Sequence, residues 1–171
     1  MQRVLILAAV LGLMLGGCGF KLRSYSLESN VESFYVDAPS QHLLRNDLRQ
    51  GLRLAGAREA DSASDAALIV ELTDARSQRR SVSTTGSARA AEYELELGVQ
   101  FRLSDAAGTE LAAPRWVVRE RVFRVDRANI VGNNEEQVLI EREMRAELVQ
   151  AVVRAINAVS ANQAAQAVDA G

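Results

Sequence analysis

The stretch AEYELELGVQFRLS, residues 91–104, decides the fold of this chain of 171 residues. Apolar and polar side chains alternate along it. The apolar ones stand at every second position and are Tyr93, Leu95, Leu97, Val99, Phe101 and Leu103. A period of two residues over this length is typical of a β-strand with one buried face and one wet face. The stretch therefore predicts a strand in a sheet that is covered on one side.

Two further strands flank this stretch and pair with it through hairpins. Residues 66 to about 82 alternate in the same way over their first part, and residues 83–87 follow as a turn. Residues 105–108 make the second turn, and the next strand runs from 111 to about 125. Pro114 interrupts that strand, which predicts an edge position or a bulge because proline cannot donate to a β-ladder.

Segments on either side of the three strands complete the domain. Residues 31–38 predict another strand, and the segment after it predicts a helix with Ser40 as its N-cap and Gly56 just past its end. Residues 57–65 are a polar connection. Residues 134 to about 159 carry an apolar stripe at helical spacing and predict the last helix.

The resulting order, β-α-β-β-β-α, predicts an α+β fold. We expect a four-stranded mixed sheet, parallel and antiparallel, with both helices packed on one face. A right-handed crossover makes the first strand parallel to the second, and the two hairpins make the remaining neighbours antiparallel. The sequence thus predicts a single domain over residues 31–159 and a disordered tail over residues 160–171.

The first eighteen residues predict the compartment. Arg3 precedes an unbroken run of apolar residues and glycine from 4 to 15, which is typical of a secretory signal peptide. The run is shorter than the roughly 20 residues that span a bilayer. We therefore expect residues 1–17 to be a signal peptide that is removed.

The motif LGGC at residues 15–18 resembles the cleavage site of bacterial lipoproteins, in which the new N-terminal cysteine carries the lipid. Cys18 is the one cysteine of the chain. We expect Cys18 to be the lipid anchor and residues 18–30 to be a lipidated tether, while an ordinary signal peptide that happens to contain a cysteine is the alternative. In such lipoproteins Asp after the cysteine favours the inner membrane, so Gly19 implies the outer membrane.

The residue counts exclude several classes of function. A single cysteine excludes a disulfide framework and a four-thiolate metal site. His42 is the one histidine, which opposes a catalytic zinc site, and no nucleotide-binding or hydrolase motif is present. The formal net charge of −2 opposes a strongly basic nucleic-acid binder. We expect no enzyme activity, cofactor, metal or nucleic-acid partner, and a surface or capping role for His42.

Arginine is concentrated in two windows of the hairpins. Residues 75–91 hold four arginines and no acid, and residues 114–127 hold five arginines against two acids. The predicted topology brings the ends of these windows together at one end of the sheet, beyond the helices, and the candidate ligand-binding residues there are Arg79, Arg80, Arg89, Arg124 and Arg127. A basic end of this kind binds phosphate, contacts a polar barrel wall, or stays solvated, and the residues alone leave these readings open.

Three segments, in the same order, resemble one family. The segment CGFKLR at 18–23 resembles the mature start of the LptE family of lipopolysaccharide-assembly lipoproteins. The segments AEYELELGVQFRLSDAAG at 91–108 and NNEEQVLIEREMRAELVQAVVRAI at 133–156 resemble its central hairpin strand and its last helix. The order of elements agrees as well.

The resemblance implies a function that is not enzymatic. It implies a lipid-anchored protein of the outer membrane, on the periplasmic side, that sits in the lumen of an LptD-like β-barrel in a one-to-one complex. There it would plug the barrel, help it to assemble, and bind lipopolysaccharide on its way to the outer leaflet. The rival readings are a periplasm-facing auxiliary lipoprotein of a lipid transporter that is not housed in a barrel, and a cell-wall enzyme.

Overall fold

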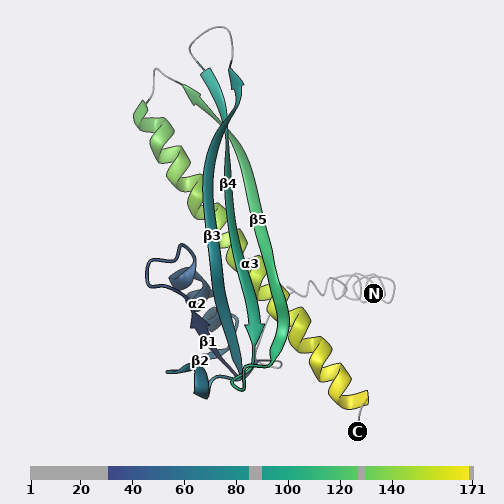
Figure 1. Ribbon diagram of the computed structural model, residues 1–171. Helices are drawn as coiled ribbons and strands as arrows, with labels where there is room; N and C mark the ends of the chain where they lie inside the picture. Colours follow the sequence, from purple (N-terminus) through teal and green to yellow (C-terminus); the bar gives the residue numbers. More distant parts are fainter. Residues whose placement is uncertain (1–30, 85–89, 127–129, 170–171) are drawn as a thin grey trace, which may run out of the picture.

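The computed structural model describes residues 31–84, 90–126 and 130–169 (Figure 1). This part of the chain forms a mixed sheet with two helices against one of its faces, as expected. The elements, in chain order, are β1 (Ser33–Asp37), α2 (Arg45–Leu54), β2 (Arg58–Glu59), a short 3₁₀ helix (Ala63–Asp65), β3 (Leu68–Thr84), β4 (Ala90–Ser104), β5 (Glu110–Asp126) and α3 (Ile130–Asp169).

The sheet has five strands in the order β2-β1-β3-β4-β5, so the prediction of four strands is wrong. The additional strand, β2, pairs in parallel with β1 and is only two residues long. A strand of two residues is too short to show an alternation of apolar and polar side chains. The sequence of residues 57–65 therefore predicts only a polar connection. The remaining pairing is as predicted, because β1 is parallel to β3 and the two hairpins are antiparallel.

The start of α2 differs from the prediction. The helix begins at Arg45, and the hydroxyl of Ser40 bonds the side chain of Gln41 instead of capping a helix. A turn closed by the hydrogen bond from the His42 N–H to the Pro39 carbonyl, 3.0 Å long, separates Ser40 from the helix. The N-cap position is held by Leu44, without a side-chain cap, and the Leu44 N–H donates a hydrogen bond of 3.2 Å to Nδ1 of His42 in the turn before the helix.

Helix α3 is longer than the apolar stripe that predicts it. It runs from Ile130 through Asp169, whereas the sequence predicts a disordered tail after residue 159. The last turns are rich in alanine, which has the highest helix propensity, and this composition extends the helix beyond its apolar stripe. No helix in the described ranges is long and apolar enough to cross a membrane.

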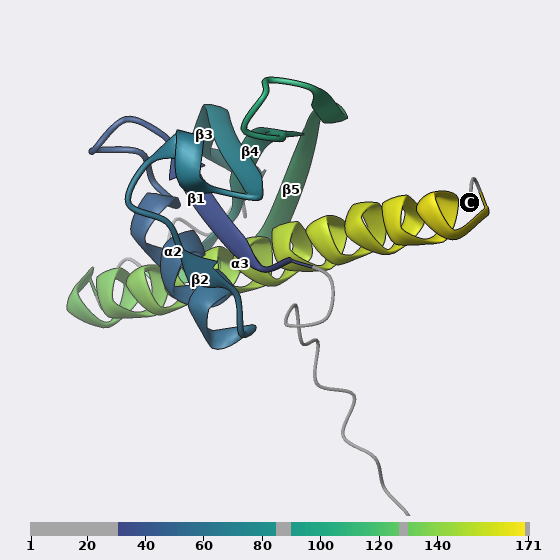
Figure 2. The same ribbon diagram turned by 90° about the horizontal axis from the view of Figure 1, so that it is seen from below.

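The core lies between the sheet and the two helices, which occupy the same side of the sheet (Figure 2). The predicted face of β4 is buried, with Leu95 through Leu103 at no more than 3% exposure. The principal helical side chains packed against the sheet are Leu44, Leu48, Leu52, Met144, Leu148, Val152 and Ile156. Further along the hairpin this face of β3 becomes polar, from Ser77 to Ser81.

The two helices lie in close contact at Gly51 of α2. A Cβ at this position would overlap the Cγ1 atom of Val149 on α3. Val149 is buried, and its β-branched side chain has little rotamer freedom in a helix. The absence of a side chain at Gly51 therefore sets how closely α2 packs on α3.

Candidate functional site

The arginines of the predicted ligand site divide between the two faces of the sheet. Arg79 lies opposite Leu95 and so faces the helices, whereas Arg80 lies opposite Glu94 on the open face. Arg124 lies opposite Glu92, also on the open face. Because successive residues of a strand point to opposite faces, neighbours in sequence do not share a site here. Arg89 and Arg127 lie outside the described residues.

The open face of the hairpins carries a series of ion pairs between neighbouring strands, which we call the cross-strand ladder. Glutamates of β4 pair with arginines of β3 and β5, and one arginine of β4 pairs with a glutamate of β3. The pairs are Arg102–Glu71, Arg76–Glu96 at 2.7 Å, Arg80–Glu94 at 2.5 Å and Arg124–Glu92 at 3.0 Å. Residues 75–91 hold no acid, yet in the folded protein glutamates of β4 lie beside the arginines of this window.

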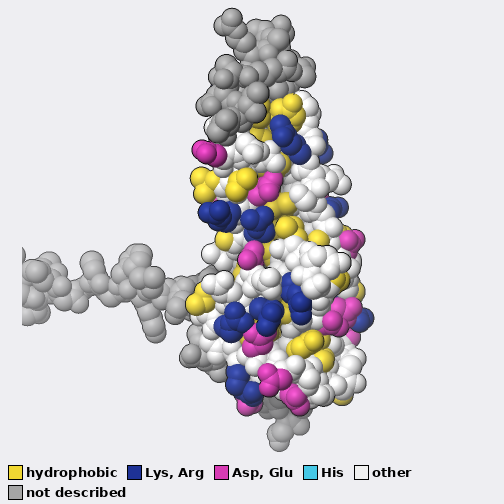
Figure 3. Space-filling model, turned by 90° about the vertical axis from the view of Figure 1, so that its left-hand side faces the viewer, with side chains coloured by type: hydrophobic (Ala, Val, Ile, Leu, Met, Phe, Trp, Pro, Cys, Tyr) yellow, Lys and Arg dark blue, Asp and Glu magenta, His cyan; other side chains and the backbone are white. Residues whose placement is uncertain are grey.

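The cross-strand ladder balances charge along the sheet. On the side of the molecule that Figure 3 shows, which is the side of β1 and α2, basic and acidic side chains also lie next to one another. Glu94 is only 13% exposed while Arg80, which covers it, is 66% exposed. Arg124–Glu92, in which both side chains are exposed, contributes about 0–1 kcal/mol to stability. A phosphate that binds Arg80 or Arg124 must therefore compete with a glutamate already in place.

Trp116 lies on the same open face and stacks with Arg76. The Cζ atom of Arg76 is 4.6 Å from the centroid of the tryptophan ring. Gly98, on β4 between them, makes room: a Cβ there would lie 3.1 Å from Arg76 Nε and 3.4 Å from Trp116 Cε3. Trp116 is 37% exposed and is joined on β5 by the more exposed Val122. It is thus a rim residue of the sheet, and it is held by a cation–π contact.

On the helix side, arginines tie the hairpins to α3. The Cζ atom of Arg79 is 4.0 Å from the centroid of the Tyr93 ring, and its Nη1 donates a hydrogen bond of 3.0 Å to the Gln137 side chain. Arg119 and Arg121 of β5 both pair with Glu147 of α3. The first half of α3 therefore lies beside the polar part of the hairpin. The prediction that this part projects beyond the helices is wrong.

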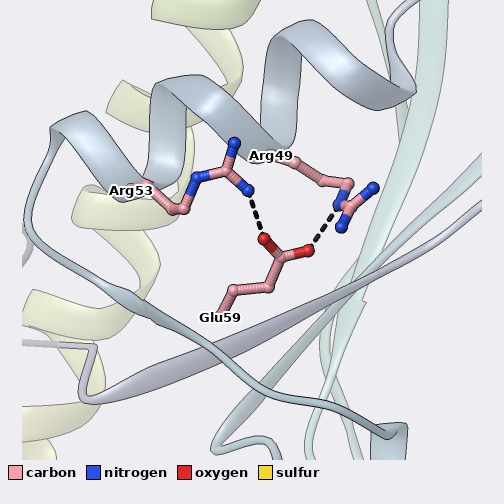
Figure 4. Close-up of polar contacts among 3 residues, drawn as sticks. All are labelled: Arg49, Arg53 and Glu59. Atoms are coloured by element: carbon pink, nitrogen blue, oxygen red, sulfur yellow. Dashed lines mark hydrogen bonds and ion pairs between the residues drawn. The ribbon is translucent and has the colours of Figure 1, made fainter.

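A second charged cluster lies on α2 and β2, away from the hairpin tip (Figures 1 and 4). Arg49 and Arg53, one turn apart on α2, each bond one carboxylate oxygen of Glu59. Burial alone would raise the pKa of Glu59, but the hydrogen bonds and charges of the two arginines outweigh it and lower this pKa. The sequence places the arginines on one face of the helix, yet it does not identify Glu59 as their partner.

Metal binding has no support in the part of the chain that the structure describes. No three histidine, cysteine, aspartate or glutamate side chains gather there in a way that could hold a metal ion. His42 is half-buried, and this burial lowers its pKa in spite of the opposing effect of Asp74. A neutral His42 at neutral pH suits its role as an acceptor at the start of α2.

The chain is similar to lipoproteins of known structure. A lipoprotein B of Nitrosomonas europaea is 28% identical, with a TM-score of 0.71, over 86% of this chain and 94% of the other. The rare lipoprotein B of Shewanella oneidensis is 23% identical, with a TM-score of 0.66, over 77% and 98%. A minor lipoprotein of Acinetobacter baumannii is 22% identical, with a TM-score of 0.63, over 78% and 93%. The last two likenesses show the fold alone.

Comparison of the sequence with protein-family models agrees with these structural likenesses. No match was found among curated proteins. The family model "LptE: Lipopolysaccharide-assembly" matches residues 31–156, which span β1 to most of α3. The chain therefore belongs to the LptE family of lipopolysaccharide-assembly proteins.

Proposed function

We propose that this protein is an outer-membrane lipoprotein that sits in the lumen of an LptD-like β-barrel, plugs it and helps it to assemble, and binds lipopolysaccharide in transit. The observation that carries the proposal is the family match over residues 31–156, which supports a non-enzymatic role in lipopolysaccharide assembly. The lipid anchor is Cys18, and the stoichiometry is one protein to one barrel.

The surface of the sheet supports a position inside a barrel. The lumen of an outer-membrane barrel is polar, so a protein that fills it needs a polar surface. The cross-strand ladder gives the open face such a surface, with each of its arginines paired to a glutamate. The other face is closed by α2 and α3, so the protein has its own core before it meets a partner.

Lipopolysaccharide binding is assigned to the arginines near the tip of the hairpin. Guanidinium groups bind phosphate through paired donors, and lipid A is multiply anionic. Arg80 and Arg124 are the described candidates on the open face, and Arg89 and Arg127 remain candidates from the sequence. Arg79 is a weaker candidate because it is already held by Tyr93 and Gln137.

Capture from native membranes tests the barrel partner. We expect crosslinking of the tagged full-length protein to recover one large barrel protein in a one-to-one ratio. The matched control is an unrelated outer-membrane lipoprotein with the same tag, which should recover none. If no barrel protein is recovered, the protein acts outside a barrel, as an auxiliary lipoprotein would. Conditional depletion should then show whether lipopolysaccharide still reaches the cell surface.

Fractionation of a Cys18→Ala variant tests the anchor. With a cleavable signal peptide in place, and in cells that lack the barrel partner, the variant should move from the outer membrane to the soluble periplasmic fraction. The loss of the lipid explains this outcome, since each buried CH₂ contributes about 0.8 kcal/mol of membrane binding. A variant that still fractionates with the outer membrane would show that Cys18 is not the anchor.

A further inference from the structure

A groove with an apolar floor lies between α2 and α3, which Figure 2 shows on the same side of the sheet. Its volume of about 560 Å³ is within the range of sites that bind small molecules. None of the arginines predicted as ligand-binding residues lines it, so the proposed function does not account for this groove. The apolar residues of its lining are Gly51, Leu54 and Ala55 at the end of α2, and Ala146, Val149 and Val153 of α3.

The two helices run in the same direction along the groove. Asp47 of α2 pairs with Arg145 of α3 at 3.7 Å, and one turn further along both helices Gly51 lies against Val149. Arg142 and Arg154 of the lining are about 18 Å apart along α3, from the helical rise of 1.5 Å per residue. The groove is therefore elongated, with an arginine toward each end.

The apolar lining combines a closed floor with an exposed wall. Val149 and Val153 are 8% and 7% exposed and form the floor. Leu54 is 80% exposed, more than any other large apolar side chain in the described ranges. A ligand with a hydrocarbon part would remove Leu54 from water, which is favourable for apolar surface.

The positive charge of Arg154 is not balanced. Arg142 and Arg154 are both exposed, and neither forms an ion pair with a described residue. Asp47, the one acid of the lining, lies toward the Arg142 end and is paired with Arg145. The helical neighbours three and four positions from Arg154 include no acid, since they are Gln150, Ala151, Asn157 and Ala158.

We propose that this groove binds a long-chain fatty acid, with the hydrocarbon chain along the floor and the carboxylate at Arg154. The apolar lining suits the chain, and a guanidinium group binds a carboxylate through two parallel hydrogen bonds. Arg154 is the site of the carboxylate because no acid competes for it, whereas Asp47 lies toward the other end. This inference goes beyond the proposed function and does not rest on it.

The form of the groove favours a fatty acid over a protein segment. Its walls are helices, whose backbone N–H and C=O groups bond within each helix. An extended peptide in the groove would therefore leave its own backbone groups without partners, at a cost that a hydrocarbon chain does not have. A stable protein interface also takes about 20–30 residues from each side, while 11 residues line this groove.

Photocrosslinking of the full-length protein in a nonionic detergent tests the site. The probe is a long-chain fatty acid that carries a diazirine group in its chain. We expect saturable labelling that maps by mass spectrometry to the lining of α2 and α3, and that excess unlabelled hexadecanoate removes. Hexadecanol has the same chain without the charge, so it should compete about two- to fivefold less well.

Two matched substitutions on α3 test the position of the chain. Ala146→Trp should abolish the labelling, because the indole ring occupies the groove. Ala146 is exposed, so the variant should fold. Ala158→Trp is the control, since Ala158 is exposed on the same helix and does not line the groove, and it should label as the wild type does.

A second pair of substitutions tests the carboxylate. Arg154→Gln should weaken the apparent affinity for the probe by about two- to fivefold, as the loss of an exposed ion pair does. Arg58→Gln is the control, since Arg58 is 67% exposed on β2 and lies outside the lining.

Several outcomes overturn the proposal. They are labelling that does not saturate, labelling that persists in Ala146→Trp, and an Arg154→Gln variant affected no more than Arg58→Gln. A wild type that takes no label and forms a dimer, which Ala146→Trp converts to a monomer, would assign the groove to a second copy of the chain. A variant with Arg80, Arg89 and Arg124 changed to Gln should label as the wild type does, so this groove and the hairpin arginines can fail separately.

Discussion

The guanidinium group of Arg79 lies over the ring of Tyr93, with Cζ 4.0 Å from the ring centroid, on the face of the sheet that α3 covers. The Phe123 ring is also within reach, with its centroid 5.4 Å away. Arg80, the next residue, lies on the opposite face against Glu94. Two adjacent arginines of one strand thus have different roles: Arg79 holds the hairpin to the helix, and Arg80 belongs to the open surface.

Substitution of one arginine on each face, Arg79 and Arg124, should separate the roles. Arg79→Gln should lower the free energy of unfolding by about 1 kcal/mol, because it removes a partly desolvated cation–π contact and a hydrogen bond to α3. Arg124→Gln, on the open face like Arg80, should change it by less than about 0.5 kcal/mol, since it breaks an ion pair in which both side chains are exposed. Urea denaturation of both variants measures the difference. Equal effects would contradict the assignment of Arg79 to the helix contact.

The hairpin arginines should act together in lipopolysaccharide binding. A variant with Arg80, Arg89 and Arg124 changed to Gln should bind lipopolysaccharide more weakly and with a smaller dependence on salt, because three cations are removed. Its thermal stability and its recovery of the barrel should stay as in the wild type. The matched control is Arg102→Gln, which breaks the ladder pair with Glu71 near the other end of β4.

The outcome of that experiment discriminates between two surfaces. If the triple variant binds lipopolysaccharide as the wild type does, the hairpin arginines are not the binding site. If it loses the barrel and keeps lipopolysaccharide, the tip of the hairpin faces the barrel wall.

Gly51→Ala should loosen the contact between the two helices. Overpacking against Val149 costs about 1–3 kcal/mol, while the gain in helix propensity from glycine to alanine returns about 1 kcal/mol. We therefore expect a net loss of up to about 2 kcal/mol in the free energy of unfolding, measured with urea. The control is a double-mutant cycle with Val149→Ala. If the two changes prove additive, the clash with Val149 is not the cause.

The cluster of Glu59 with Arg49 and Arg53 should make stability depend on pH in the acid range. The two arginines lower the pKa of Glu59 below its ordinary value of 4.5. The folded state therefore holds the proton less readily than the unfolded state, and the contribution of Glu59 is present above pH 4.5 and is lost as the pH falls through the folded pKa. Each arginine is partly exposed, so this contribution is below about 1 kcal/mol per pair.

Denaturation at several pH values checks this prediction. The difference in free energy of unfolding between the wild type and Glu59→Gln should shrink between pH 6 and pH 3. Glu32→Gln, whose side chain in the wild type is 86% exposed, is the control and should follow the wild type. A difference that stays constant with pH would show that Glu59 acts through packing alone.

The strands and the core could be predicted from the sequence because they depend on periodicity. The alternation from Leu95 to Leu103 is buried as predicted. Pro114 lies in the edge strand β5, and the pairing between β4 and β5 shifts register beside it, from Phe101 to Ser104. What could not be predicted is local and short: β2 has two residues, and the turn after Pro39 moves the start of α2 past Ser40.

The candidate site was harder to predict because its electrostatics depend on register. Arg80 has no acid near it in sequence, yet the β3–β4 pairing sets it opposite Glu94. The same pairing turns Arg79 toward the helices. A count of charges along the chain contains neither fact, since both require knowing which residues lie opposite one another and which face each occupies.

The edge strand β5 bears on how the protein is produced. It borders the sheet over 17 residues and has a neighbouring strand on one side only, so its other side is a template for a strand of another molecule. Proline and arginine oppose such pairing, and β5 carries both, at Pro114, Arg115, Arg119, Arg121 and Arg124. The arginines of β5 should therefore oppose self-association of protein made in excess, and low salt, which leaves their charges unscreened, should favour the monomer.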